Sequence, residues 1–255
     1  MCVAAIAWEA SPHWKLVVAA NRDEYHDRPA TPLARWADGP GIIAGRDLSA
    51  GGTWLGLSEA GRLTLVTNFR VEGYPMPGRP SRGGLVTDLL AGADPLRLPL
   101  AQFNPCNVFH ADTSGARFLT NHPAAATMPL APGIHGVSNG AIDAPWLKTR
   151  RLSAALTRWV GEQSVNAAEA DFTPLFAALL DPAPTVTERT AEGPEPRFSA
   201  IFVADPNYGT RCSTVIAIDH TGRGRAIERS FMPDGRPNNE VDLAFRWPPA
   251  AAVRE

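Results

Sequence analysis

Cysteine is scarce in this sequence, which has three of them in 255 residues: Cys2, Cys106 and Cys212. They lie far apart and form no CxxC pair and no cysteine and histidine spacing, so the sequence shows no zinc-binding pattern and no disulfide framework. The six histidines form no HExxH and no CxxCH motif, so the sequence shows neither the zinc motif of common metalloproteases nor the motif for covalent attachment of c-type haem. This cysteine usage fits a reducing compartment, and we expect a cytoplasmic protein.

Long apolar runs and strong net charge are also missing. No segment reaches the ~18 uninterrupted apolar residues of a transmembrane helix, and the start "MCVAAIAWEASPHWK" has an acid before any base, unlike a signal peptide. The formal net charge of -2 provides no basic surface for nucleic acid and no polybasic membrane patch. No GxGxxG or GxxxxGK[ST] loop follows a strand. We therefore expect a soluble protein whose partners are small molecules rather than nucleic acid.

The sequence does contain enough apolar residues, 44% of the chain, for one substantial core. Short strand patterns dominate both ends of the chain and helical patterns the middle, which predicts an α+β fold built on antiparallel sheet in a single domain of residues 1–255. Residues 181–196 are rich in proline, threonine and charge, which is typical of a surface loop. The expected strands lie at 2–8, 15–20, within 41–57, and at 61–70, 106–112, 116–122, 134–140, 197–205, 211–220, 224–231 and 241–247.

Three helices are expected, at residues 81–90, 145–163 and 171–180. The second has the clearest helical period, and Asp143 is a candidate cap for its start. Its charged residues, Lys148 among them, are expected on the surface. Its apolar stripe consists of Leu152, Leu156, Trp159 and Val160.

The first two strand patterns, 2–8 and 15–20, flank a Ser-Pro turn and predict a β-hairpin. Antiparallel pairing places the start of the first strand beside the end of the second, so Cys2 becomes a neighbour of the run from Asn21 to Glu24. Such a polar run is either the solvated end of a strand or one wall of a site. Both interpretations are open at this point.

A cysteine at position two has a particular chemical option. Removal of Met1 would leave Cys2 with a free thiol and a free α-amine, whose reference pKa values of about 8.5 and about 8 are matched near neutral pH. The amine can then act as a base for its own side chain in acyl chemistry, with Asp23 orienting the amine. The alternative is that Cys2 is a small buried apolar residue at a sheet edge.

Several motifs together resemble one protein family across nearly the full length. These are "MC" followed by "ANRDE", then "GRDLSAGGTWLG", "LVTNFR", "SNGAIDAPWLKTRRL" and "YGTRCSTV". They are similar to the NRDE family, also called the transport and Golgi organisation protein 2 family. That family in turn resembles a branch of the N-terminal nucleophile hydrolases, most similar to bile-salt hydrolases and penicillin V acylases. The resemblance implies a four-layer αββα sandwich of two antiparallel sheets.

The resemblance also implies roles for individual residues. Cys2 would be the nucleophile, Asp23 of Asn21-Arg22-Asp23 would contact its amine, and Asn68 with Asn139 would stabilise the oxyanion. Asn21, Arg22 and a late arginine, either Arg197 or Arg211, would bind the substrate. The acylases carry an arginine directly before the Asn-x-Asp motif, whereas this chain has Ala20 there. From the residues alone, either asparagine could instead satisfy backbone groups of its own turn.

The sequence thus predicts a hydrolase or acyltransferase that uses an N-terminal cysteine on an amide or thioester of a small acylated molecule and needs no cofactor. The alternative is a carrier in the same fold that binds haem, an acyl-CoA or a lipid without turnover, as the family's link to haem or lipid handling implies. A third interpretation is an inactive scaffold whose NRDE loop contacts another protein.

Overall fold

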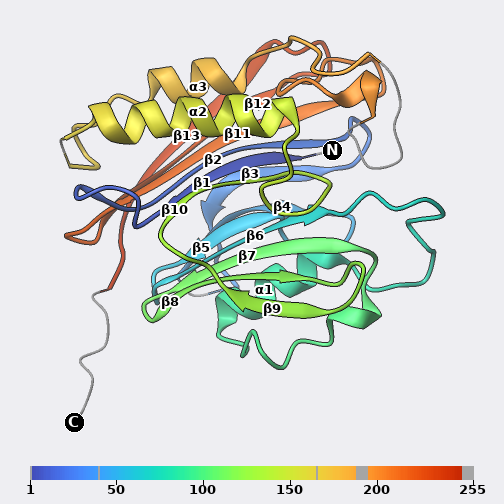
Figure 1. Cartoon of the computed structure of the whole chain (residues 1–255), viewed down its shortest axis with the longest axis horizontal. Coiled ribbons are helices and arrows are strands. Elements are labelled where there is room, and N and C mark those ends of the chain that lie inside the picture. The colour runs from blue at the N-terminus through green and yellow to red at the C-terminus, as the bar shows by residue number, and fades with distance from the viewer. Residues whose placement is uncertain (1, 40, 165, 188–194, 249–255) are drawn as a thin grey trace.

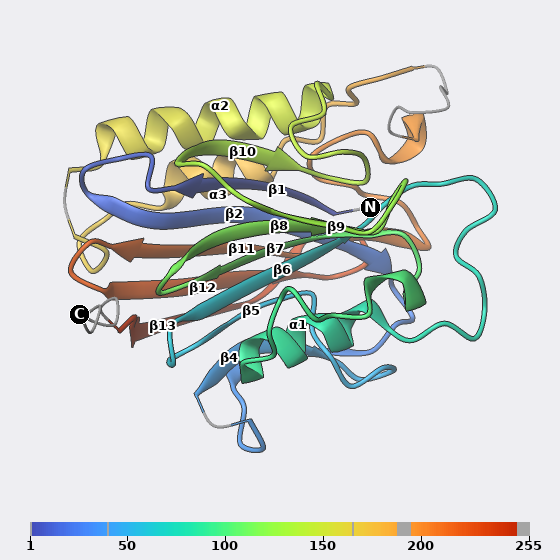
Figure 2. The same ribbon diagram turned by 60° about the horizontal axis from the view of Figure 1, so that its bottom comes forward.

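The computed structural model shows two antiparallel sheets stacked face to face between helices. Helices α2 (Leu147–Glu162) and α3 (Thr173–Leu179) cover the outer face of one sheet, and α1 (Arg82–Ala91) covers the outer face of the other (Figures 1 and 2). The chain is therefore an α+β protein with the predicted αββα layers. The structure describes residues 2–39, 41–164, 166–187 and 195–248.

The sheet beneath α2 and α3, called sheet A here, joins the two ends of the chain. Its strands are β1 (Val3–Trp8), β2 (Trp14–Tyr25), β10 (Gly133–Val137), β11 (Tyr208–Asp219), β12 (Arg223–Phe231) and β13 (Pro237–Arg246). They lie in the order β10-β1-β2-β11-β12-β13, so the N-terminal hairpin is sandwiched between later strands. All neighbouring pairs are antiparallel.

The second sheet, sheet B, is a meander in which each strand pairs with the next one along the chain. Its strands are β3 (Ala30–Arg35), β4 (Ile42–Asp47), β5 (Leu55–Ser58), β6 (Arg62–Asn68), β7 (Cys106–Asp112), β8 (Gly115–Thr120) and β9 (Ala126–Pro129). Strands β4 to β8 correspond to patterns that the sequence predicts, whereas it does not predict the edge strands β3 and β9, and β6 joins β7 through the long segment that carries α1.

The continuous apolar character of β1 follows from its burial on both faces. Ile6 and Trp8 point into the core between the sheets, while Ala5 and Ala7 point toward the helices. Side chains alternate along a strand, so a strand that is covered on both sides needs apolar residues at every position. The small alanines on the helix side allow α2 to approach the sheet closely.

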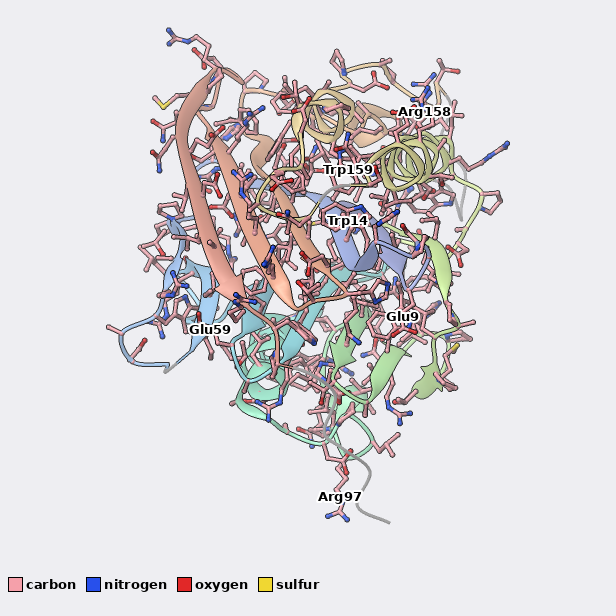
Figure 3. The ribbon with its side chains drawn as sticks, turned by 90° about the vertical axis from the view of Figure 1, so that its left-hand side faces the viewer. Glu9, Trp14, Glu59, Arg97, Arg158 and Trp159 are labelled. Carbon is pink, nitrogen blue, oxygen red and sulfur yellow. The ribbon has the colours of Figure 1, made fainter. Side chains whose placement is uncertain are left out.

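Helix α2 presents its predicted apolar stripe to sheet A. Its Trp159 ring lies 4.9 Å from that of Trp14 on β2, measured between centroids, and Figure 3 shows the two indoles between helix and strand. The expectation that Lys148 lies on the surface is wrong: 0% of it is exposed. Lys148 precedes Leu152 by four residues, so the helical period places it on the buried stripe.

No helix in the described ranges has the length and apolar character needed to cross a bilayer.

Two further local predictions are wrong. Asp143 does not cap α2, whose N-cap is Trp146 without a side-chain hydrogen bond; the Asp143 carboxylate instead accepts the Gly136 N–H at 2.7 Å. The expected strand at 197–205 is a 3₁₀ turn, Pro196–Phe198, followed by irregular chain. Of the expected loop at 181–196, residues 188–194 lie outside the described residues, as does Met1.

Strand β2 continues through the polar run that was expected to follow it. It reaches Tyr25, because β11 supplies a partner as far as the pair Tyr208 and Tyr25. Asn21 and Asp23 therefore point to one face of sheet A and Arg22 to the other, as strand alternation requires. The polar run is part of the sheet, and it divides its side chains between two environments.

A buried histidine in sheet B makes the fold sensitive to acid. Burial lowers the pKa of His110 to about 4, and its Nδ1 lies 2.9 Å from the Thr64 hydroxyl. The unfolded chain binds the proton near the ordinary pKa of about 6.5, so this contribution to stability is complete above that pH and is lost as the pH falls toward 4. Between pH 7.5 and pH 4.5, the free energy of unfolding measured with urea should fall by about 2 to 3 kcal/mol more in wild type than in His110→Gln. Equal losses in both proteins would contradict this assignment.

Candidate active site

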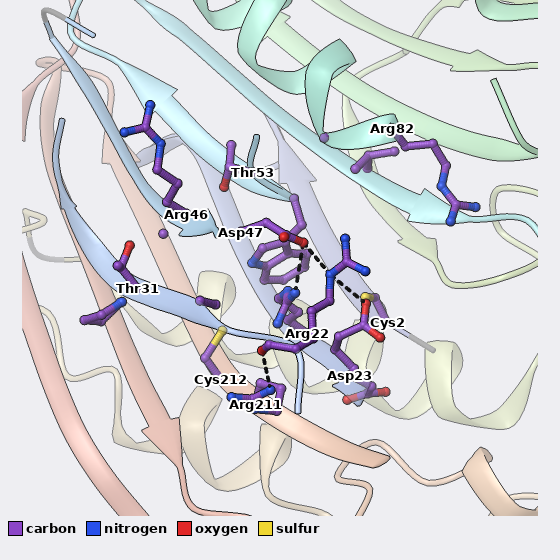
Figure 4. A pocket seen from close by; sticks show the side chains of 18 of the residues that line it. Cys2, Arg22, Asp23, Thr31, Arg46, Asp47, Thr53, Arg82, Arg211 and Cys212 are labelled. Atoms are coloured by element: carbon purple, nitrogen blue, oxygen red, sulfur yellow. Dashed lines mark hydrogen bonds and ion pairs between the residues drawn. The ribbon is translucent and has the colours of Figure 1, made fainter. Parts of the chain in front are cut away.

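A cavity of about 510 Å³ lies where β2 and β11 of sheet A meet β3, β4 and β6 of sheet B and the start of α1 (Figure 4). Its wall is strongly charged. Among the described residues that line it are two thiols, Cys2 and Cys212, four carboxylates, Asp23, Glu24, Asp47 and Glu228, and six arginines, Arg22, Arg28, Arg46, Arg79, Arg82 and Arg211.

Cys2 lies at the wall of this cavity, directly before β1. Its backbone oxygen accepts a hydrogen bond from the Ser138 hydroxyl at 2.7 Å, which ties the start of the chain to the end of β10. Burial and the negative charge of the Asp23 carboxylate raise the pKa of the Cys2 thiol, although the backbone N–H of Asp23 and the Arg22 guanidinium act in the opposite direction. The thiol therefore stays protonated at neutral pH unless a base removes its proton.

Asp23 is buried beside Cys2 and also lines the cavity. Its Oδ1 accepts a hydrogen bond from the Thr210 hydroxyl at 2.8 Å, across the pairing of β2 with β11. Burial raises the pKa of this carboxyl, while Lys148, Thr210 and Arg22 favour its ionised form. The hairpin thus places the thiol and the carboxylate at the same end of sheet A, as the sequence predicts.

Arg22 points from β2 toward sheet B. It forms an ion pair with Asp47 at the end of β4, with 3.6 Å between Nη2 and Oδ2. The same carboxylate oxygen accepts a hydrogen bond from Arg28 Nε at 2.6 Å. One acid therefore holds two arginines at the cavity wall and links the two sheets.

Arg211 reaches the cavity through a β-bulge. The register between β2 and β11 shifts between the pairs Asp23 with Thr210 and Arg22 with Cys212, so Arg211 is the extra residue. Bulges re-aim a side chain in this way and are frequent next to active sites. The guanidinium donates to the backbone oxygens of Tyr25 and Arg28 at 2.7 and 3.0 Å.

The ends of β6 and β10 are linked beside Cys2. Thr67 donates its hydroxyl to the Ser138 oxygen at 2.6 Å, and the Asn139 side chain donates to the Asn68 oxygen at 2.8 Å. Asn68 lines the cavity and is exposed there. Asn139 is buried and lies outside the described lining, so the two predicted asparagines occupy neighbouring but different positions.

The structure does not bring two of the predicted substrate-binding residues into the described cavity wall. Asn21 points toward the helices, where its amide donates to the oxygens of Leu179 and Ile201 at 2.8 and 2.9 Å. Arg197 keeps 62% of its side chain exposed and donates to Asp205 at 2.8 Å. Of the two late arginines, Arg211 is the one at the cavity.

Sequence reasoning missed several residues at this site. Arg79 and Arg82 lie where α1 begins and donate only to backbone oxygens among the described residues, at Ala101, Phe103 and Pro105. Exposed-looking arginines in a loop or in the first turn of a helix carry no pattern that would mark them as site residues in a single sequence. Lys148 did carry a signal, namely its place on the apolar stripe of α2.

The described residues contain no cluster of three or more histidine, cysteine or acidic side chains that could hold a metal ion. Histidine is also absent from the described cavity wall. The chemistry available there is that of thiol, carboxylate, amide and guanidinium groups.

Two solved structures show a distant similarity to this chain. An N-acylethanolamine-hydrolyzing acid amidase ortholog from Caenorhabditis elegans has a TM-score of 0.48 at 12% identity, covering 84% of this chain and 92% of its own. A variant of conjugated bile acid hydrolase from Clostridium perfringens has a TM-score of 0.46 at 10% identity, with 99% of both chains covered.

Sequence relatives match more strongly. The Transport and Golgi organization protein 2 homolog of Homo sapiens is 30% identical over 264 residues, which cover 91% of this chain and 94% of that protein. The Transport and Golgi organization protein 2 of Drosophila melanogaster is 24% identical over 261 residues, or 91% and 92%. The family model described as Transport and Golgi organisation 2 matches residues 1–233. The chain belongs to the Transport and Golgi organisation 2 family, as its NRDE motif indicates.

Proposed function

We propose that this protein is an N-terminal-cysteine hydrolase or acyltransferase that acts on an amide or thioester of a small acylated molecule. The observation that carries the proposal is the placement of the Cys2 thiol beside the buried Asp23 carboxylate at the wall of a cavity large enough for a ligand. Cys212 also lines this cavity, but Cys2 is the thiol that lies beside Asp23 and that would carry a free α-amine once Met1 is removed.

The reaction begins when removal of Met1 makes Cys2 the first residue of the chain. The thiol is held protonated by burial, so it needs a base, and its own α-amine is the base of matched pKa. The amine takes the thiol proton as the sulfur attacks the carbonyl carbon. The C–N or C–S bond then breaks, and the proton goes to the leaving amine or thiolate. Water or a second acceptor releases the acyl group from Cys2.

The neighbouring residues support this step. Asp23 orients the α-amine, and Thr210 fixes the carboxylate through its hydrogen bond. Asn68, at the cavity wall, donates its amide to the oxyanion. Asn139 holds the Asn68 backbone in place through the bond to its oxygen.

The cavity favours an anionic ligand. Six arginines and four carboxylates line its described wall, and Arg79 and Arg82 bond there only to backbone oxygens. Guanidinium groups bind carboxylate and phosphate well, because their paired N–H groups match the oxygen spacing. The substrate therefore carries a carboxylate or a phosphate in addition to its acyl bond.

Intact mass and acyl trapping test the proposal. The purified protein should lack Met1, and a brief reaction with an acyl thioester of N-acetylcysteamine, stopped with acid, should add the acyl mass to the peptide that begins at Cys2. A retained Met1 rules out the mechanism, since Cys2 would then have no free amine. A processed protein that neither gains the acyl mass nor cleaves thioesters and N-acyl glycines would also overturn the proposal.

The same arginine-rich wall favours one alternative, a carrier that binds an anionic ligand such as haem or an acyl-CoA without turnover. Arginines suit the propionates of haem. No histidine lines the described wall, however, and burial raises the pKa of both the Cys2 and the Cys212 thiols, so neither offers a ready axial thiolate. Saturable haem binding by wild type and by Cys2→Ala, with no acyl transfer, would favour the carrier.

A further inference from the structure

Lys148 is the most unusual buried group near the site. It is the second residue of α2, and 0% of it is exposed. Its ammonium nitrogen makes no hydrogen bond to any described residue. Lysine is almost never fully buried unless its charge is compensated, because burial removes the ammonium from water. A charged group close to Lys148 must therefore supply the compensation.

The position of Lys148 in the fold indicates what that group is. Leu152 and Leu156 continue the same stripe of α2 and pack on the face of sheet A toward which Asp23 points. Helix α2 packs against β1 and β10, and it begins at the end of the sheet where Cys2 and Asp23 lie. The charges of Asp23 and Cys2 both favour the protonated form of Lys148, against the burial that lowers the pKa of its ammonium.

We propose that Lys148 is a positioning residue for Cys2: its buried ammonium is the counter-charge that keeps Asp23 ionised and favours the Cys2 thiolate. This inference rests on the proposed function only in treating Cys2 as a nucleophile. Lys148 lies outside the described cavity wall, so it acts from the helix side of the sheet and leaves the space in front of the thiol to the substrate.

Other charged groups also act on Cys2 and Asp23, and they limit how far the two pKa values change when the Lys148 charge is lost. Arg22 of β2 acts on both Cys2 and Asp23, and Arg82 of α1 acts on Cys2. Among the described groups that act on Cys2, Asp23 is an acid, and its negative charge opposes the thiolate. Lys148 acts directly on both groups, so removing its charge raises the pKa of the thiol and of the carboxyl, and the remaining cations compensate for it only in part.

The test measures the reactivity of Cys2 rather than turnover. Iodoacetamide labelling of the Cys2 peptide, followed by mass spectrometry from pH 6 to 10, gives the apparent midpoint of the thiol. In Lys148→Met, which removes the charge and keeps most of the volume, the midpoint should move up by about one pH unit, with about tenfold slower labelling below it. Arg151→Met, the loss of a half-exposed charge on the same helix, should leave the midpoint unchanged.

Two further variants separate charge from structure. Lys148→Arg keeps the charge and should keep the wild-type midpoint, and Lys148→Gln replaces Lys148→Met if thermal melting shows that the methionine variant does not fold. An unchanged midpoint in a folded neutral variant would overturn the inference, as would an equal shift in Lys148→Arg. Because no substrate is used, failure of the hydrolase proposal would appear separately, as absent acyl transfer with the labelling shift intact.

Discussion

Replacement of Cys2 by alanine should abolish acyl transfer. The nucleophile and, in the processed chain, the base are both parts of this residue, and alanine retains only the amine. We expect the rate of thioester or N-acyl glycine cleavage to fall at least about 10⁴-fold, toward the rate without protein. Stopped assays at saturating substrate, with intact mass to confirm that Met1 is removed from both proteins, measure this.

Cys212 supplies the matched control. Its thiol lines the same cavity, but burial and the neighbouring Glu228 raise the pKa of Cys212 well above the ordinary value, so it is inert as a nucleophile. Cys212→Ala should keep the rate within a few-fold. Equal losses in the two variants would show that an intact cavity, rather than the Cys2 sulfur, is what the reaction needs.

The antiparallel α+β character of the fold could be anticipated because its signals are local, whereas its four αββα layers are expected only from the family resemblance. The hairpin of β1 and β2, the meander of sheet B and the stripe of α2 each follow from a period and a turn within a few residues. The end of β2 could not be predicted in this way. Its last residues, through Tyr25, are polar and join the sheet only because β11, far along the chain, pairs with them. Strand ends that depend on a distant partner carry no local signal.

The site was predictable to the extent that the hairpin builds it. Cys2 and Asp23 meet because Cys2 directly precedes β1 and Asp23 lies near the end of the paired strand β2, a geometry that the predicted hairpin already contains. Arg82 comes from α1 and Asp47 from β4 of the other sheet, and no period in the sequence relates them to Cys2. The burial of Lys148 does follow from the sequence, because its helical position on the apolar stripe decides its environment more strongly than its charge does. A lysine on the apolar stripe of a helix is expected to be buried, and another charged group is then expected close to its ammonium.

Asn21 illustrates how one motif serves two purposes. Substitution by leucine should destabilise the fold by about 3 to 5 kcal/mol, because two backbone oxygens and one hydroxyl would lose buried hydrogen bonds. The Asn21 amide donates to Leu179 and Ile201, and its oxygen accepts the Ser213 hydroxyl at 2.6 Å. Urea unfolding at pH 7.5 measures this loss of stability. Asn207 is exposed and serves as the control, so Asn207→Leu should change the free energy of unfolding by less than about 0.5 kcal/mol.

The same variant decides between a structural and a ligand-binding role for Asn21. The side chain anchors the end of α3 and the chain near Ile201 to the helix-facing side of sheet A, away from the described cavity wall. At 10 °C, where enough of the variant stays folded, labelling of Cys2 and the KM for an acyl thioester should therefore match wild type. A large rise in KM with unchanged stability would instead make Asn21 a substrate contact. That outcome would place Asn21 with Arg22 and Asp23 among the residues that contact the substrate, instead of giving it a purely structural role in fixing β2.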